Sequence, residues 1–175
     1  MDRQRKTLVW KALTILSVIP ILIYAHAAGP DPGKSGAPGE STCNEAGCHV
    51  GTGLNAGGGS VTIDAGGNTY TPGVTKRIKV NVSDSAQRRW GFQLTARKSD
   101  NSRAGILAPI DATTQLVCAG ANLAEVSCNS SPVKQYIEHT LSGAQMTAVG
   151  AGLTFPVRLD AGSERFRQYR LVRRG

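Results

Sequence analysis

The residues best able to do chemistry in this chain form one short motif in its N-terminal part. Two cysteines and a histidine, Cys43, Cys48 and His49, give the pattern C-x4-C-H. In the related C-x-x-C-H motif, two thiols add across the vinyl groups of haem and the adjacent histidine binds the iron. The motif therefore predicts haem c held by thioether bonds from Cys43 and Cys48, with His49 as the proximal iron ligand.

The four residues between the cysteines leave two other interpretations open. A Cys43–Cys48 disulfide would close a small loop and leave His49 in solvent. A zinc ion prefers four ligands, and two thiolates with one imidazole supply only three of them. Spacing alone does not decide between haem, a disulfide and zinc.

A haem iron on this motif could take a second axial ligand from elsewhere in the chain. His139, in a predicted strand, is the leading candidate, and Met146, in a Gly/Ala-rich stretch, is the other. A lone histidine in a strand is more often a hydrogen-bonded structural residue than a ligand. The remaining cysteines, Cys118 and Cys128, have no histidine after them, so we predict that they form a disulfide that staples a loop.

Residues 1–27 have the order of a secretory signal peptide. A basic start leads into an apolar stretch over 12–24, and Ala25-His26-Ala27 supplies a small-x-small cleavage pattern. An uncleaved membrane anchor is the alternative, but Lys11 and Pro20 leave the apolar stretch short of the roughly 20 residues of a span. We predict cleavage after Ala27 and a mature chain in the periplasm, on the cell surface or outside the cell, where cysteines can oxidise.

The elements that must position these residues are short strands. Residues 28–59 are Gly/Pro-rich without an apolar period and form an irregular arm that carries the C-x4-C-H motif. Residues 60–156 alternate apolar and polar side chains between turns, and Trp90 and Phe92 are expected in the core. We predict an all-β fold, an immunoglobulin-like antiparallel β-sandwich. Its predicted strands are 60–64, 77–82, 90–97, 104–107, 115–118 and 133–139.

Charge excludes one class of function. The chain has a net charge of +8, but the excess lies in residues 1–27 and in the Arg-rich tail 157–175. A nucleic-acid-binding face needs lysine and arginine clustered on the folded body, so we predict no nucleic-acid partner. No Ser/His/Asp set, carboxylate pair or phosphate loop is present, and we predict no enzymatic activity.

Two stretches together resemble known protein families. The run from Gly36 to Gly51 resembles the opening of bacterial choice-of-anchor V proteins, in which Gly-Ala-Pro-Gly leads to a C-x-x-C-H-like motif. The Reelin-type (reeler) domain is similar in Tyr70-Thr71-Pro72-Gly73, in the strand 78–82, in Gly91 to Arg97, in a cysteine near Cys118 and in the pair His139-Thr140. The resemblance covers residues 36–145 and implies an immunoglobulin-like sandwich that is exported and often attached to the cell surface.

The resemblance also bears on the haem. It places the motif of Cys43 and Cys48 at the family's C-x-x-C-H position, which favours haem attachment, although this chain has four intervening residues. It weakens His139 as an iron ligand, because reeler domains without a haem motif carry a similar His-Thr pair.

The tail 157–175 departs from the pattern that the chain resembles. That pattern continues with a Phe-x-Phe-x-Trp-like strand and an anchoring tail, whereas this tail is rich in arginine. One hypothesis is a basic tail that binds an anionic surface. The other is a frameshift over residues 166–175, which would remove the last strand and any anchor and leave an unpaired sheet edge.

The sequence thus predicts an exported, non-enzymatic module that carries one c-type haem for electron transfer or redox sensing, with a redox partner. The alternative is a cell-surface binding or adhesion module without a cofactor, stapled by Cys43–Cys48 and Cys118–Cys128. In both cases, membrane contact is expected only through the signal peptide or a missing C-terminal anchor.

Overall fold

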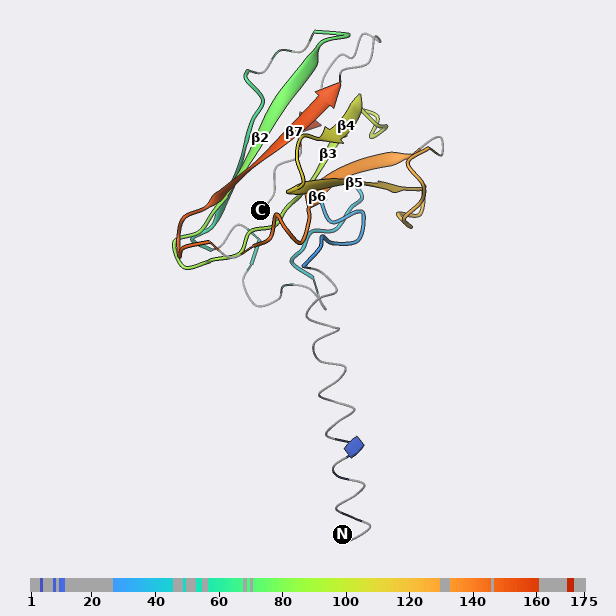
Figure 1. Cartoon of the computed structure of the whole chain (residues 1–175). Coiled ribbons are helices and arrows are strands. Elements are labelled where there is room, and N and C mark those ends of the chain that lie inside the picture. The colour runs from blue at the N-terminus through green and yellow to red at the C-terminus, as the bar shows by residue number, and fades with distance from the viewer. Residues whose placement is uncertain are drawn as a thin grey trace.

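The computed structural model describes residues 4, 8, 10–11, 27–45, 49, 53–54, 57–67, 69, 71–129, 133–145, 147–160 and 170–171. Within these ranges the regular secondary structure is almost wholly strands, which form two antiparallel sheets (Figure 1). The all-β prediction is therefore confirmed. No helix in these ranges is long and apolar enough to cross a membrane.

Each sheet has four strands. The first has the order β1-β2-β7-β4, made by β1 (Ser60–Asp64), β2 (Thr75–Ser83), β7 (Leu153–Asp160) and β4 (Ile106–Pro109). The second has the order β5-β6-β3-β8, made by β5 (Thr114–Ala119), β6 (Lys134–His139), β3 (Gln93–Arg97) and β8 (Arg170–Leu171). All of the predicted strands match an observed strand in part, and β1 matches to the residue.

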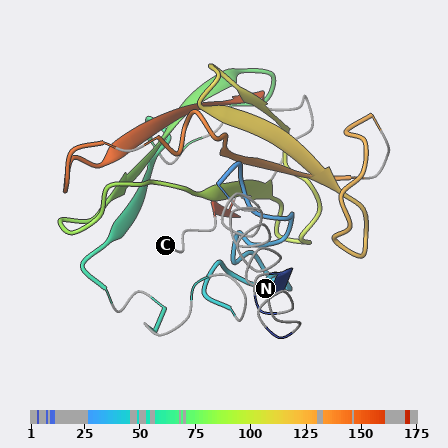
Figure 2. The ribbon, with the colours of Figure 1, turned by 60° about the horizontal axis from the view of Figure 1, so that its bottom comes forward.

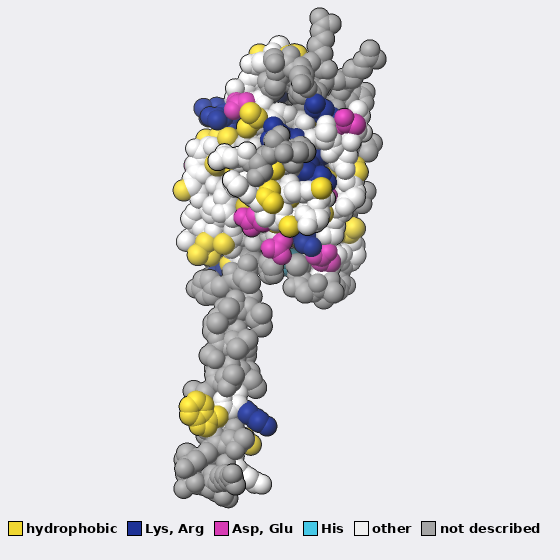
Figure 3. Space-filling model, turned by 90° about the vertical axis from the view of Figure 1, so that its right-hand side faces the viewer, with side chains coloured by type: hydrophobic (Ala, Val, Ile, Leu, Met, Phe, Trp, Pro, Cys, Tyr) yellow, Lys and Arg dark blue, Asp and Glu magenta, His cyan; other side chains and the backbone are white. Residues whose placement is uncertain are grey.

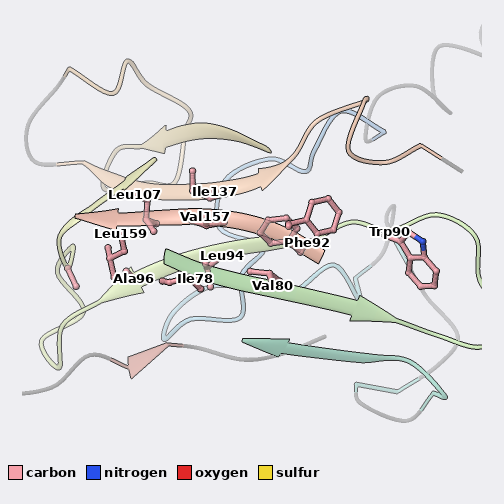
Figure 4. Packing of buried hydrophobic residues seen from close by; sticks show 12 residues of the cluster. Ile78, Val80, Trp90, Phe92, Leu94, Ala96, Leu107, Ile137, Val157 and Leu159 are labelled. Carbon is pink, nitrogen blue, oxygen red and sulfur yellow. The ribbon is translucent and has the colours of Figure 1, made fainter. Parts of the chain in front are cut away.

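The core lies between the two sheets, where the apolar side of each alternating strand is buried (Figure 4). The rings of Phe92 and Phe155 lie with their centroids 4.7 Å apart. Trp90 is 3% exposed, and its indole Nε1 donates a hydrogen bond to Thr147 Oγ1 at 2.8 Å. Trp90 and Phe92 are core residues, as predicted. Both aromatic side chains bury a large apolar area, and the polar N–H of Trp90 has a hydrogen-bond partner.

The central strand β7 was not predicted. It pairs with β2 over Thr75–Val82 and with β4 over Ile106–Pro109, so it holds the first sheet together. Proline normally argues against a central strand, because it cannot donate to the ladder. Pro156 is tolerated here because β4 does not extend far enough to pair with it. The last residue of β4, Pro109, pairs with Val157, one residue short of Pro156. β7 also spans residue 156, the boundary that the sequence analysis set between the sandwich and the tail.

The disulfide predicted between Cys118 and Cys128 is present, with the two Cα atoms 5.1 Å apart. It closes a loop that folds back on the end of β5, where Ala119 forms a β-bridge with Glu125. The backbone N–H of Val126 donates to the carbonyl of Cys118 at 2.8 Å. The disulfide is compatible with an exported protein, because such bonds persist in oxidising compartments.

Candidate functional site

The second sheet turns a set of polar side chains away from the core. In β3 and β6 the residues that alternate with the core positions lie on the outer face, and they include Gln93, Thr95, Arg97, Tyr136 and Glu138. Four of these are nonetheless almost completely buried, since only Gln93 keeps appreciable exposure. The cover is supplied by residues 28–45, here called the docked arm, which lie against β3, β5 and β6 (Figure 2).

The start of the docked arm lies on a row of three side chains that crosses the sheet. Gln115, Glu138 and Gln93 are direct neighbours on β5, β6 and β3. Nε2 of Gln115 donates to Glu138 Oε1 and Nε2 of Gln93 donates to Glu138 Oε2, both at 2.9 Å. The same two amides also donate to arm carbonyls, to Ala28 at 2.6 Å and to Asp31 at 3.1 Å. Burial raises the pKa of Glu138 to about 7, although both amide hydrogen bonds act to lower it.

The middle of the arm is a tight hairpin. Ser35 and Thr42 form an antiparallel β-bridge, and the N–H of Glu40 donates to the carbonyl of Ala37 at 2.9 Å. Gly39 has a φ of 78° and follows Pro38, which is the sequence and geometry of a type II turn. The turn leads directly into Glu40, whose side chain reaches down to the sheet.

Glu40 forms a buried ion pair with Arg97. Its Oε1 accepts hydrogen bonds from Arg97 Nη2 at 2.5 Å and from Tyr136 Oη at 2.7 Å, and its Oε2 accepts one from Ser35 Oγ at 2.6 Å. The side chains of Glu40 and Arg97 are 0% and 1% exposed. Burial, followed by the bond to Glu40, raises the pKa of Tyr136. Nζ of Lys134 lies 3.8 Å from Glu40 and adds a second, more exposed cation.

The C-x4-C-H loop follows this anchor along the chain. The N–H of His49 donates to the carbonyl of Cys43 at 3.0 Å, which closes the loop on itself. Glu45, inside the loop, forms an ion pair with Lys34 of the arm, and the hydrogen bond from Lys34 is the largest cause that lowers the pKa of Glu45. Cys43 is half-buried and His49 is exposed, while Cys48 lies outside the described residues.

His139, the predicted distal ligand, lies at the end of β6 on the opposite side of the strand from Glu138. It is 8% exposed, and the backbone N–H of Phe92 donates to its Nδ1 at 3.1 Å. Its ring lies against Gly91, where an added β-carbon would be 2.6 Å from Cε1. The structure thus gives His139 a packing partner and a hydrogen bond, and its role as a ligand stays a prediction. Met146 lies outside the described residues.

The structure brings the predicted site residues together in two groups. Cys118 is bonded to Cys128, and His49 meets the backbone of Cys43. In the part of the chain that is described, which omits Cys48, no three His, Cys, Asp or Glu side chains converge as a metal site. The disulfide loop also reaches the arm, because a β-carbon at Gly33 would lie 2.8 Å from Cδ1 of Leu123.

The residues that dock the arm were missed in the sequence analysis. Arg97 is the last residue of β3 and Glu138 the second-to-last residue of β6, and a charged residue that alternates with core positions usually faces water. The available signal was weak. Polar residues recur on the outer face of both β3 and β6, but this pattern is ordinary for a face exposed to solvent and so did not indicate that the face is covered. Glu40 carried no signal of its own, because nothing in the sequence paired it with Arg97, 57 residues further on.

Comparison with known proteins gave no relative. No family model matches the chain, no curated protein matches it, and no solved structure matches it.

Proposed function

We propose that this chain is an exported, immunoglobulin-like module of the Reelin type that carries one c-type haem on the loop Cys43–His49. Two thiols and an imidazole are the donor set that such a haem requires, so the residues of the loop fit the group. Cys43 and Cys48 would form the thioether bonds, and His49 would bind the iron. When bound, the haem would supply a reversible one-electron centre, suited to electron transfer or to redox sensing.

The observation that carries the proposal is the closure of the loop on a firmly docked arm. The hydrogen bond from His49 to Cys43 brings the first and last residues of the motif together. Glu40, three residues before Cys43, fixes the arm to Arg97 and Tyr136 inside the protein. The exposed His49 side chain therefore follows a segment that is fixed to the body of the protein, and preorganisation of this kind favours binding.

The test is to express the full precursor in a host that exports it and matures c-type cytochromes. We expect a Soret band, a pyridine haemochrome spectrum of one haem per chain, and haem that stays with the polypeptide on a denaturing gel. Cys43→Ala and Cys48→Ala should each reduce covalent attachment, and the double variant should abolish it. The pair Cys118→Ala and Cys128→Ala removes the same number of thiols at the other loop and should keep the haem.

The second axial position is tested in the same material. His139→Gln and Met146→Leu should each be compared with the wild type in the visible spectrum of the oxidised and reduced protein. The variant that removes the sixth ligand should convert a low-spin spectrum to a high-spin one without loss of covalent haem. If neither variant changes the spectrum, His139 and Met146 are both excluded as ligands.

A cofactor-free binding or adhesion module is the second candidate. The specific observation in its favour is the Cys118–Cys128 disulfide. The oxidising compartment in which this disulfide persists would also favour a disulfide between Cys43 and Cys48. Colourless protein from the maturing host, with a peptide mass that joins Cys43 to Cys48 by a disulfide, would select this candidate and end the haem proposal.

A further inference from the structure

One buried carboxylate is left without a cation among the described residues. Glu138 is 2% exposed, and within that part of the chain its two oxygens accept hydrogen bonds from the neutral amides of Gln93 and Gln115. The charged side chains that act on it through space, Asp31 of the arm and Glu125 of the disulfide loop, are both acidic. On the face that Figure 3 shows, acidic side chains lie along the lower end of the body, with a Lys or Arg side chain among them. A carboxylate buried without a cation is costly, because its charge has lost its water.

The chain that lies on this carboxylate is the beginning of the docked arm. The carbonyl of Ala28 and Oε1 of Glu138 accept hydrogen bonds from the same atom, Nε2 of Gln115. Gly29 is so close that an added β-carbon would lie 2.2 Å from Oε1 and 2.7 Å from Cδ of Glu138. Its φ of 118° also belongs to the region that only glycine enters freely. Ala28 therefore directly precedes the residue that lies against the carboxylate, and its carbonyl shares a donor with that carboxylate.

We propose that Glu138 is the counter-ion of a new α-ammonium group on Ala28, created when residues 1–27 are removed. This inference rests on the export and cleavage that form part of the proposed function, and not on the haem. A signal peptidase would add water across the Ala27–Ala28 peptide bond, leaving a carboxylate on Ala27 and an ammonium group on Ala28. The precursor has a neutral amide at that nitrogen, so only the processed chain can form the ion pair and hold the start of the arm by it.

The ion pair has a defined effect on the α-amino group. An ionised carboxylate beside an ammonium group favours the charged form, so the pKa of the α-amino group should rise above its usual value of roughly 8.

The experiment compares two chains exported from full-length precursors. One is the wild type, which should begin at Ala28. The other has one alanine inserted between Ala27 and Ala28, which displaces the ammonium group by one residue. N-terminal sequencing establishes where each chain begins, and each is made with Glu138 and with Glu138→Gln. Chemical unfolding at pH 7.5, and NMR titration of the α-amino group of each chain, give the readouts.

We expect the inserted alanine to raise the unfolding equilibrium constant at pH 7.5 by about tenfold when Glu138 is present, the equivalent of one pKa unit. The insertion should have little effect in the Glu138→Gln background, and the α-amino group should titrate lower in the extended chain, because it has lost the nearby carboxylate. An equal effect in both backgrounds, or the same titration of the α-amino group in both chains, overturns the ion pair. A processed chain that does not begin at Ala28 overturns it as well. The presence or absence of haem in the same samples reports separately on the haem proposal.

Discussion

Replacing Glu40 with glutamine should free the docked arm from the second sheet. The carboxylate of Glu40 is the acceptor for Arg97 Nη2 at 2.5 Å and for Tyr136 Oη at 2.7 Å. Two other nitrogens of the buried guanidinium, Nε and Nη1 of Arg97, already have no hydrogen-bond partner among the described residues. Glu40→Gln removes the negative charge and leaves Arg97 buried with no counter-ion that is equally close.

The size of the effect follows from this burial. Removing one partner of a buried ion pair costs about 3–5 kcal/mol, because the remaining charge stays desolvated. The arm lies outside the two packed sheets, so it can undock and return Arg97 to water. Undocking limits the loss to the free energy that docking contributes. We therefore expect the free energy of unfolding to fall by about 2–4 kcal/mol.

Urea unfolding followed by tryptophan fluorescence measures the loss, and hydrogen exchange shows where it occurs. The amide of Gly36, which donates to the carbonyl of Ser41 at 2.8 Å, should exchange faster in Glu40→Gln, while amides of β2 and β7 follow global unfolding. Glu45→Gln is the matched control, because it makes the same chemical change on the same arm at a partly exposed ion pair with Lys34, whose side chains are 20% (Lys34) and 32% (Glu45) exposed. Its effect should be smaller, because water reaches and screens this pair.

Two results would refute the reasoning. One is an equal loss in Glu40→Gln and Glu45→Gln, and the other is unchanged exchange at Gly36. A second variant separates charge from packing: Glu40→Leu combined with Arg97→Met removes both charges and keeps the bulk. Replacing a buried ion pair with apolar side chains is often neutral or stabilising, so the double variant should recover much of the loss that Glu40→Gln causes.

Two further tests examine other parts of the structure. Gly91→Ala puts a β-carbon 2.6 Å from Cε1 of His139 and should lower the free energy of unfolding by about 1–3 kcal/mol; Gly58→Ala, which meets no atom within 4 Å, is its control in thermal unfolding. Removing the disulfide with Cys118→Ala and Cys128→Ala should cost about 2–3 kcal/mol. The same loss should follow from adding a reductant to the wild type and should not follow from adding it to the double variant.

The strands were largely predictable because alternation is a local property of the chain. Ile78 and Val80 alternate with charged residues in β2, and the structure buries both of them at 1% exposure. β7 alternates in the same way with Phe155, Val157 and Leu159, but it also contains Pro156, and a proline argues against a central strand. Whether a proline breaks a sheet depends on how far the neighbouring strand extends, and that is a tertiary fact which the local sequence does not contain.

The arm was less predictable than the strands, for a physical reason. Residues 28–45 have no apolar period, and an element of that composition is normally solvated. This arm docks through polar groups, with Gln93, Gln115 and Arg97 as donors and the Glu40 carboxylate and arm carbonyls as acceptors. Such contacts need complementary geometry at residues distant in sequence, so they leave no periodic pattern to find.

Docking and the chemistry of the loop are linked by distance along the chain. Only two residues separate Glu40 from Cys43, so a thiol at Cys43 cannot move far from the sheet while the Glu40–Arg97 ion pair is formed. If haem is attached to the loop, undocking the arm should change the solvent exposure around the residues that would hold it. A haem-loaded Glu40→Gln variant should accordingly keep its covalent haem and change its reduction potential, because solvent exposure is one of the factors that set the potential. An unchanged potential in that variant would mean that the loop holds its cofactor independently of the arm.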